Sequence, residues 1–558
     1  MKKEILLLAI ILKTVFIQAQ SPNWVWANSI GGPTEDSGRA LVLDAAGNVY
    51  STGNYKGTAD FDPGPGVFNL TSNGNNDVFI TKTDAAGNFV WAKSIGSTSY
   101  DAGTGISVNA AGDVCVVGHY IATVDFDPGS GVVNYNSSTD GCNMFILKLN
   151  TAGDFLWAKV MGGTSATYVN AVTEDAAGNI YTTGSFGTYG DFDPGSGVYP
   201  LSVSGAAMFI SKLDALGNFV WAKQIGGTTY DYGRAIKIDP TGDLVIAGSF
   251  GGTADFDPGV GVSNLTSAGG FDTFVCKMDT AGVFIWAKGV GGPNTESGIS
   301  MDVDGLGNIY TTGSFSGTVD FDPGAGVALC STVVLGDIYL FKLNSSGNFV
   351  WVKTMGGPGD DGGFAVTVDA LNNVYTTGFF NDSADFDPGI DSLRLTSAGG
   401  WDIFITKFSS AGNFIWAKSA GSANHESGYG LAVDPSGYVY FTAEYASPTL
   451  VLAPITLTNV VSVGYYSDMV IAKLNYGTIG IDEQNNGSLI SLFPNPTSNY
   501  LTIETTKPTN ISIVNLLGQE ICHSKIKTSE RIDVSFLSNG IYFVKDLQNG
   551  GSIKFVKQ

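Results

Sequence analysis

The sequence predicts an all-β chain, and three observations support that prediction. A pattern close to Phe-x-Trp-Ala-Lys recurs through most of the 558 residues, apolar and polar residues alternate over short runs, and Gly, Asn and Asp cluster between the runs. These are the patterns of short strands joined by tight turns. The repeated tryptophans lie 64 to 66 residues apart, which indicates one supersecondary unit used many times: Trp26, Trp91, Trp157, Trp221, Trp286, Trp351 and Trp416.

Each repeat is expected to contain four antiparallel strands. Starting from Trp91, we expect strands at residues 88–93, 105–108, 114–120 and 143–149. Tight turns at 109–113 and 150–154 connect them, and a long loop precedes the last of these strands. Four antiparallel strands per unit are typical of a propeller blade. The repeats therefore predict a seven-bladed β-propeller.

The two ends of the repeat array predict how the propeller closes. The first copy, residues 23–30, has the Trp-containing strand but no strand of its own before it. The last copy has strands expected at 431–434, 438–442 and 468–474 but no Trp-containing strand after them. The N-terminal strand is therefore expected to complete the seventh blade, which would leave no open edge for aggregation. The alternative is an open solenoid with a frayed end.

The repeat also resembles a known family. Gly-x-[Ala/Ser]-[Ile/Val]-x-Val-Asp-x-x-Gly-Asn-x-Tyr-x-Thr-Gly is followed by Asp-x-Phe-Ile-x-Lys-Leu and then by the Trp-containing strand. This pattern is similar to the seven-bladed β-propeller repeat (SBBP) family of bacterial secreted proteins, over residues 23–475. The resemblance implies a fold but little chemistry, because function depends on sites added to folds.

The C-terminal residues differ from the repeats. Residues 476–488 form a polar linker, and residues 489–558 contain short alternating runs with a basic tail. Their motifs are Pro494-Asn495-Pro496 and Gly540-Ile-Tyr542-Phe-Val-Lys545. They are similar to the C-terminal sorting domain of the type IX secretion system in Bacteroidetes-type bacteria. That resemblance implies a small β-sandwich, recognition by the type IX machinery, and anchoring at the cell surface or release. The alternative is an ordinary β-sandwich binding module.

The N-terminal sequence is typical of a secretory signal peptide. Lys2 and Lys3 precede an apolar run at residues 5–12, and the small Ala19 allows cleavage before Gln20. We therefore expect a signal peptide at 1–19 and the propeller at 20–475. The apolar run is too short to span a bilayer, and we expect no transmembrane segment in the mature chain.

Charge and cysteine content exclude some classes of function. The formal net charge is −23, so nucleic acid is not an expected partner, because phosphate binding requires a basic surface. A cation suits such a chain better. The five cysteines show no paired spacing, and we expect neither a disulfide framework nor a Cys-x-x-Cys metal site.

A first set of acidic residues follows the repeated tryptophans by ten positions. In a propeller these positions lie next to the strand that lines the central channel, so we expect a ring of carboxylates at the channel mouth. Such a ring is suited to binding a cation or the basic groups of a ligand. Alternatively, each carboxylate accepts hydrogen bonds within its own turn and faces water. The third repeat has Thr167 here, and the others have Asp36, Asp101, Asp231, Glu296, Asp361 and Glu426.

A second acidic set is the sequence Asp-Phe-Asp-Pro-Gly in six of the repeats. Residues two apart in an extended segment share a face, and Ca²⁺ prefers oxygen ligands. The set therefore predicts weak calcium sites, and the alternative is an Asp-capped turn without metal. We expect both acidic sets at the same end of the blades. The pairs are Asp60 and Asp62, Asp125 and Asp127, Asp191 and Asp193, Asp255 and Asp257, Asp320 and Asp322, and Asp385 and Asp387.

The remaining features favour binding over catalysis. The tryptophans alternate with smaller residues along their strand, so we expect them to pack against a neighbouring blade rather than to bind sugars. No common catalytic or nucleotide-binding motif is present. We expect a monomeric, non-enzymatic, extracellular or cell-surface scaffold that binds a protein or glycan, with calcium as its only expected cofactor. The alternatives are a polysaccharide-active enzyme that uses channel-mouth carboxylates, and a structural component of a surface layer.

Overall fold

The structure is a computed structural model, and all of its regular elements are β-strands. It describes residues 22–137, 141–227, 229–332, 334–389, 391–460, 466–475, 490–494, 496–505, 507–515, 520–547 and 552–557. The expected signal peptide (1–19), the expected linker (476–488) and Asn495 lie outside these residues. A search of the described residues finds no helix long and apolar enough to cross a membrane. The chain divides into Ser21–Tyr476 and a C-terminal unit.

Within Ser21–Tyr476, four-stranded antiparallel sheets follow one another along the chain, as the repeat predicts. The earlier sheets are β2 (Asp36–Leu43), β3 (Val49–Asp60), β4 (Asn69–Thr83) and β5 (Phe89–Ile95); β6 (Ala102–Val108), β7 (Val114–Tyr120), β10 (Asn143–Leu149) and β11 (Phe155–Met161); and β12 (Thr167–Glu174), β13 (Ile180–Phe186), β16 (Ala207–Leu213) and β17 (Phe219–Gly227). The next is β18 (Asp231–Ile238), β19 (Leu244–Asp255), β20 (Asn264–Met278) and β21 (Phe284–Val290), which a short pairing of β17 with β19 joins to its predecessor.

The later sheets have the same strand order. They are β22 (Ser297–Val303), β23 (Ile309–Phe315), β26 (Asp337–Leu343) and β27 (Phe349–Met355); β28 (Gly362–Val368), β29 (Val374–Phe380), β32 (Asp402–Phe408) and β33 (Phe414–Ala420); and β34 (Glu426–Val433), β35 (Val439–Tyr445), β38 (Asp468–Asn475) and β1 (Asn23–Ile30). Small hairpins extend the long loops: β8 (Thr123–Asp125) with β9 (Asn134–Asn136), β14 (Tyr189–Asp191) with β15 (Pro200–Ser202), β24 (Thr318–Asp320) with β25 (Leu329–Ser331), β30 (Ser383–Asp385) with β31 (Arg394–Thr396), and β36 (Thr449–Leu452) with β37 (Ile455–Thr458).

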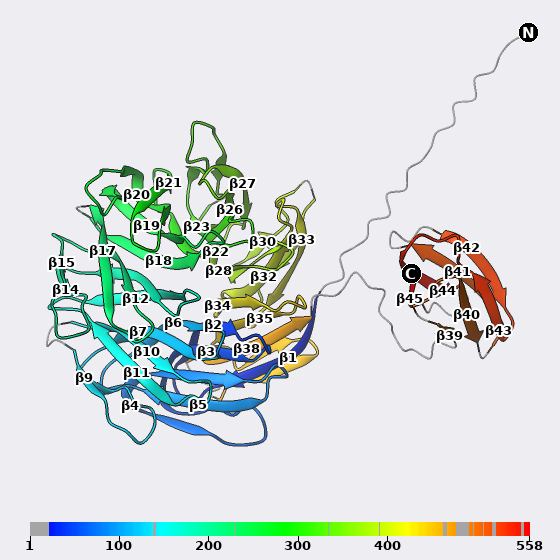
Figure 1. Ribbon diagram of the computed structural model, residues 1–558, viewed down its shortest axis with the longest axis horizontal. Coiled ribbons are helices and arrows are strands. Elements are labelled where there is room, and N and C mark those ends of the chain that lie inside the picture. Colours follow the sequence, from blue (N-terminus) through cyan, green and yellow to red (C-terminus); the bar gives the residue numbers. More distant parts are fainter. Residues whose placement is uncertain are drawn as a thin grey trace, which may run out of the picture. The chain divides into compact units, whose positions relative to one another are not determined.

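The N-terminal strand joins the last sheet, as the sequence predicts. Strand β1 pairs antiparallel with β38, with Asn23 opposite Asn475 and Ile30 opposite Met469. The first strands of successive sheets also contact one another, from β2 through β6, β12, β18, β22 and β28 to β34, and β34 contacts β2. Figure 1 shows these strands gathered around the middle of this unit.

Hydrophobic cores lie between neighbouring sheets. One cluster combines Tyr50 and Ile80 of the β2–β5 sheet with Val116 and Phe145 of the β6–β11 sheet, and all four are at most 1% exposed. Because each sheet buries a face against the next, stability in this unit depends on the junctions between repeats.

The repeated tryptophans form part of these junctions. The indole of Trp26 lies against Gly87 in the turn of the next sheet, and its Nε1 donates to the carbonyl of Ala85 at 3.3 Å. The same indole–glycine contact joins Trp91 to Gly153 and Trp351 to Gly412. Packing against a neighbouring sheet is therefore confirmed, but most of these indoles are half-buried rather than fully enclosed, Trp416 at 4% exposure being an exception.

The turn glycines fit both the turn and the indole. Gly87 has φ +86°, a left-handed conformation that favours glycine, and an added Cβ would lie 2.8 Å from Cδ2 of Trp26. Gly242 has φ +88°, but nothing lies within 4 Å of its added Cβ. The two glycines therefore have the same backbone conformation and differ in the indole contact.

We expect Gly87→Ala to destabilise the protein more than Gly242→Ala. Both changes place a Cβ on a left-handed residue, but only the first drives a methyl group into an indole. Overpacking typically costs about 1–3 kcal/mol, so the free energies of unfolding should differ by about that amount. Urea unfolding followed by tryptophan fluorescence measures it. Equal losses would show that the indole contact is loose.

The C-terminal unit contains two antiparallel sheets. One comprises β39 (Ile490–Phe493), β40 (Tyr500–Thr505) and β43 (Ser529–Asp533), and the other comprises β42 (Glu520–Ile526), β41 (Thr509–Asn515), β44 (Gly540–Asp546) and β45 (Ser552–Lys557). Leu501 and Ile503 of the first sheet share a core with Ile513 and Val544 of the second. Two sheets that enclose one core are the arrangement expected of a small sandwich.

Candidate ligand-binding channel

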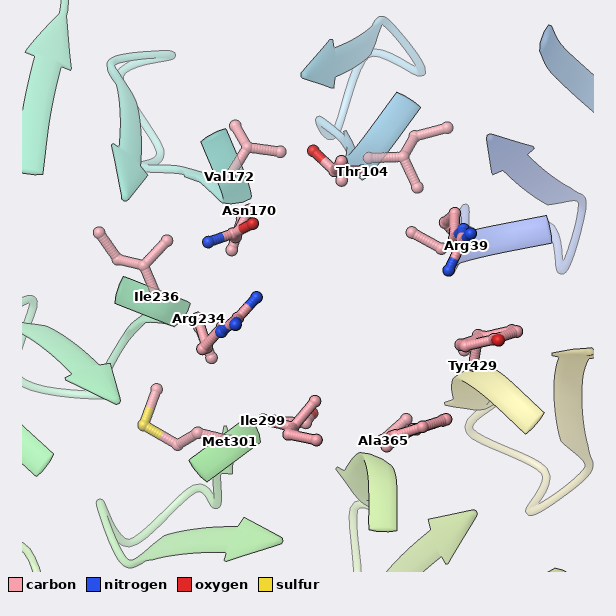
Figure 2. Close-up of a pocket in the computed structure, with 18 of the residues that line it drawn as sticks. Arg39, Thr104, Asn170, Val172, Arg234, Ile236, Ile299, Met301, Ala365 and Tyr429 are labelled. Carbon is pink, nitrogen blue, oxygen red and sulfur yellow. The ribbon is translucent and has the colours of Figure 1, made fainter. Parts of the chain in front are cut away.

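A cavity of about 650 Å³ lies where the first strands of the sheets meet. Every one of the strands β2, β6, β12, β18, β22, β28 and β34 contributes lining residues, so the cavity is the central channel of this unit. Its volume is within the range typical of small-molecule sites. Figure 2 shows side chains from these strands directed around an open centre.

A β-bulge in each of these strands supplies one lining residue. The pairing of β2 with β3 shifts between Gly38 and Ala40, which leaves Arg39 as the extra residue, and the pairing of β18 with β19 shifts likewise around Arg234. Bulges commonly re-aim a side chain next to a functional site. The bulge residues all line the cavity but differ chemically: Arg39, Thr104, Asn170, Arg234, Ile299, Phe364 and Tyr429.

Two arginines are the most distinctive bulge residues. The chain contains four arginines, and two of them, Arg39 and Arg234, occupy equivalent positions on different sheets. Figure 2 shows them on opposite sides of the open centre. Arg39 lies 4.9 Å from the ring centroid of Tyr429, and Arg234 lies 5.1 Å from that of Tyr232. Among the described residues, no ion pair involves either guanidinium group.

The described side chains that line the channel are neutral or cationic, and two carboxylates, Glu444 and Asp302, contact lining residues. Burial and the charge of Arg39 lower the pKa of His119 to about 4, so this imidazole is neutral at pH 7. Glu444 accepts hydrogen bonds from Ser37 Oγ at 2.8 Å and Tyr429 Oη at 2.7 Å. Lys237 lies 3.3 Å from Asp302. None of the described residues that line the cavity is an Asp or Glu.

The residues of the predicted ring of carboxylates lie at or just before the start of the first strand of each sheet, and they are buried. Asp36, Asp101, Asp231, Glu296, Asp361 and Glu426 are 0–2% exposed, and none is among the lining residues. Each accepts a backbone N–H from four residues earlier, as from Gly32 to Asp36 at 2.7 Å and from Gly357 to Asp361 at 2.9 Å. These carboxyl groups hold the turns between sheets, and the binding role predicted for them stays a prediction.

Sequence reasoning missed the partners of these carboxyl groups. Four of them have a second carboxyl on the third strand of the preceding sheet, 24 residues earlier in the chain: Asp77 for Asp101, Asp272 for Glu296, Asp337 for Asp361 and Asp402 for Glu426. The repeat that has Thr167 instead of an acid has Asn143 at the partner position. In the sequence, these partner carboxyls are the Asp residues that begin the Asp-x-Phe-Ile-x-Lys-Leu motif, and the repetition of that Asp could have indicated them.

Burial raises the pKa of these paired carboxyls. It raises the pKa of Asp36 to about 8 and that of Glu296 to about 7, and the neighbouring charges of Asp468 and Asp272 add to the two effects. The pKa of Asp272 is raised to about 6 by the same burial. Close, buried carboxyls cannot all ionise at low cost, so the folded state holds protons at these junctions that the unfolded chain releases.

We expect stability to fall as pH rises from about 4 to about 8. A carboxyl whose folded pKa is raised contributes stability that is complete below the unfolded pKa and is lost as pH rises through the folded pKa. The double change Asp272→Asn and Glu296→Gln should flatten this slope by on the order of 1–3 kcal/mol, since one pKa unit corresponds to about 1.4 kcal/mol. Urea unfolding at pH 5, 7 and 9 measures the slope, with Asp391→Asn at an exposed site as the control. An unchanged slope in the double variant would contradict this assignment.

The Asp-Phe-Asp-Pro-Gly loops have one repeated geometry. Asp60 Oδ1 accepts the backbone N–H groups of Asp62 at 3.1 Å and Phe68 at 2.8 Å, and Asp62 Oδ1 accepts that of Gly64 at 2.8 Å. The intervening Phe61 is 1% exposed. The other five copies repeat these bonds from Asp125 and Asp127, Asp191 and Asp193, Asp255 and Asp257, Asp320 and Asp322, and Asp385 and Asp387.

These bonds favour the Asp-capped turn that the sequence left open, while calcium binding stays a prediction. We expect Asp60→Ala to lower the free energy of unfolding by about 1–3 kcal/mol, because two backbone donors lose a charged acceptor. Asp60→Asn, which keeps an acceptor oxygen, should lose less. Thermal melts in calcium and in chelator provide the measurement. A calcium-dependent rise in the wild-type melting temperature that Asp60→Asn abolishes would instead show a metal site.

Both acidic sets lie at the same end of the sheets, as expected from strand direction. The N–H of Asp60 donates to the carbonyl of Gly31 at 3.1 Å, and Gly162 and Asp191 exchange two such bonds. The Ala-Gly-Asn turns lie at the opposite ends of the strands, where Asp44 Oδ1 accepts the N–H groups of Ala46 and Asn48.

The sorting motif residues belong to the C-terminal unit. Gly540, Tyr542 and Lys545 all lie on β44, between β41 and β45. Tyr542 is 8% exposed, and its hydroxyl donates to the carbonyl of Ser538 at 2.9 Å. Pro494 and Pro496 flank Asn495 just after β39.

Comparison with known proteins identifies the C-terminal unit. Residues 491–558 match the family model of the secretion system C-terminal sorting domain. The protein is therefore exported by type IX secretion to the cell surface or the extracellular space. The resemblance of residues 489–558 to this domain is confirmed.

The repeats have more distant relatives. An uncharacterized WD repeat-containing protein of Acanthamoeba polyphaga mimivirus is 24% identical over 519 residues, covering 78% of this chain and 36% of its own length. The regulatory protein FlaEY of Caulobacter vibrioides is 23% identical over 177 residues, 31% of this chain and 18% of that protein. This chain thus spans about a third or less of the length of these two relatives.

Solved structures also match. The WD40 β-propeller domain of Doa1 aligns with a TM-score of 0.36 and 7% identity, covering 82% of this chain and 98% of that chain. Sqt1 from Chaetomium thermophilum aligns with a TM-score of 0.36 and 10% identity, covering 81% of this chain and 99% of its own.

Proposed function

We propose that residues 20–475 form a closed, seven-bladed propeller that binds an extracellular ligand in its central channel without catalysing a reaction. Seven sets of four strands, two of them joined into one sheet, support closure, as do the pairing of β1 with β38 and the contacts of β34 with β2. The sorting domain delivers this propeller outside the cell, where a protein or glycan ligand is available.

The bulge residues are the observation that carries the binding proposal. Residues flanking the bulge repeat from sheet to sheet, as Gly38, Gly233 and Gly298 show, whereas the residue that enters the channel varies, and only arginine occurs there twice. A purely structural channel has no need for such variety, while one asymmetric ligand does. A pocket whose wall combines apolar side chains with placed polar and charged groups is typical of binding sites.

The composition of the wall supports binding over hydrolysis. Glycoside hydrolysis generally requires two carboxyl groups on either side of the bond. The described lining residues contribute none, and the buried carboxyls beside the channel are bonded to backbone N–H groups. His119, with a pKa of about 4, is a weak general base.

Filling the channel tests this proposal. We expect Ile299→Trp, at a bulge, to abolish binding of the full chain to its ligands on arrays of glycans and peptides. Ile285→Trp is the control, because Ile285 lies on β21 at the outside of a sheet and is 45% exposed. Both variants should keep the wild-type circular dichroism spectrum. Binding that survives Ile299→Trp would place the site outside the channel and contradict the proposal.

A further inference from the structure

We propose that Arg39 and Arg234 form an anion-binding site in the channel and that its ligand is an acidic saccharide. The inference rests on the proposed function and adds the chemistry of the ligand. It depends on the two bulge arginines, on the carboxylates around them and on the aromatic side chains of the same wall.

The arginines lack protein counterions in the channel. No ion pair among the described residues involves them, and each guanidinium group lies over an aromatic ring. Guanidinium remains charged at any physiological pH and presents five donors in a fixed plane. A carboxylate, which accepts two of these donors side by side, matches that geometry.

Two carboxylates that contact lining residues, Glu444 and Asp302, already have protein partners. Both oxygens of Glu444 accept protein hydroxyls, and Asp302 lies 3.3 Å from Lys237 and accepts the N–H of Val368 at 2.9 Å. The described lining residues themselves include Arg39, Arg234 and Lys237 but no Asp or Glu, in a chain of net charge −23. Because the Debye length at physiological ionic strength is about 8 Å, the acids on distant surfaces are largely screened from an anion held here.

Aromatic side chains of the same wall favour a saccharide over a flexible acid. The ring of Tyr429 already contacts Phe364, with centroids 5.3 Å apart, and Arg39, so the aromatic surface offered to a ligand is that of Tyr100, which is 36% exposed at the cavity. Flat aromatic faces pack against the C–H faces of sugar rings. Arg39 and Arg234 lie across the channel from each other (Figure 2), so a rigid oligomer with regularly spaced carboxylates can reach both.

The test uses the full chain and a panel of uronate oligomers. Titration calorimetry would compare oligogalacturonate, alginate oligomers and glucuronate-containing heparosan oligomers, with methyl-esterified oligogalacturonate as the uncharged counterpart and hexaglutamate as a non-saccharide acid. We expect at least one uronate oligomer to bind, esterification to weaken that binding, and added salt to weaken it further.

The variants are Arg39→Gln and Arg234→Gln. Each should raise the Kd for the acidic oligomer at least about tenfold. Arg394→Gln is the matched control, because it removes the same charge from an exposed position on β31 and should change the Kd less than about twofold. In the wild-type chain, bound oligomer should slow phenylglyoxal labelling of Arg39 and Arg234 but not of Arg394. This measurement does not depend on whether a variant folds.

The outcomes separate this inference from the proposed function. Suppose that Ile299→Trp blocks binding of a ligand, but neither esterification nor either arginine variant changes its Kd. The channel then binds a ligand, as proposed, and the proposal of an anion site at the arginines is wrong. Binding of hexaglutamate with no uronate oligomer would also overturn the saccharide assignment. If no ligand of any class binds in the channel, the inference and the proposed function both fail.

Discussion

The contact between an indole of one repeat and a left-handed glycine of the next is the constraint on which the rest of the unit depends. Trp26 shows it most clearly, because it lies on the N-terminal strand and reaches the turn at Gly87, while its own strand pairs with β38 near the end of the array. The two ends of the repeat region are therefore tied together by both backbone pairing and side-chain packing. The inner strands can then surround a cavity without contributing to a single large core.

The same junctions also hold unfavourable groups. Pairs of buried carboxyls, such as Asp272 and Glu296, are retained where two sheets meet, although burial raises their pKa values. Each carboxyl accepts a backbone N–H of a turn, which an apolar residue cannot do. Satisfying those donors offsets part of the cost of burying the acid. The neutral pair Asn143 and Thr167 shows that a junction also forms without the acids.

Much of the fold could be predicted from the sequence, and less of the site could be. Repetition made the strands, the turns and the role of residues 23–30 predictable, since each unit repeats the same local rules. The acidic residues were visible for the same reason, and their bonds to their own turns were among the alternatives, but the burial of Asp36 and its equivalents was not, because it depends on the packing of one sheet against the next. The bulges were more difficult to predict than the buried acids. The one-residue shift at Arg39 depends on strand pairing and does not change the pattern of alternating apolar residues. An arginine at the same repeat position in two units of an arginine-poor chain was the one indication in the sequence.

The sheets and turns repeat along the chain, whereas the bulge residues that line the channel vary. This difference suggests how the protein acquires binding specificity. A bulge frees one side chain per inner strand from the ladder, so that residue can change without disturbing the sheet or the junction behind it. Gly38 and Gly233 precede Arg39 and Arg234 in the same backbone setting in which Gly298 precedes Ile299 and Gly428 precedes Tyr429. Cation, aliphatic and aromatic groups are thus interchangeable at these positions at little cost to the fold. Binding chemistry can therefore vary at the centre while the outer strands, the turns and the exported tail remain the same.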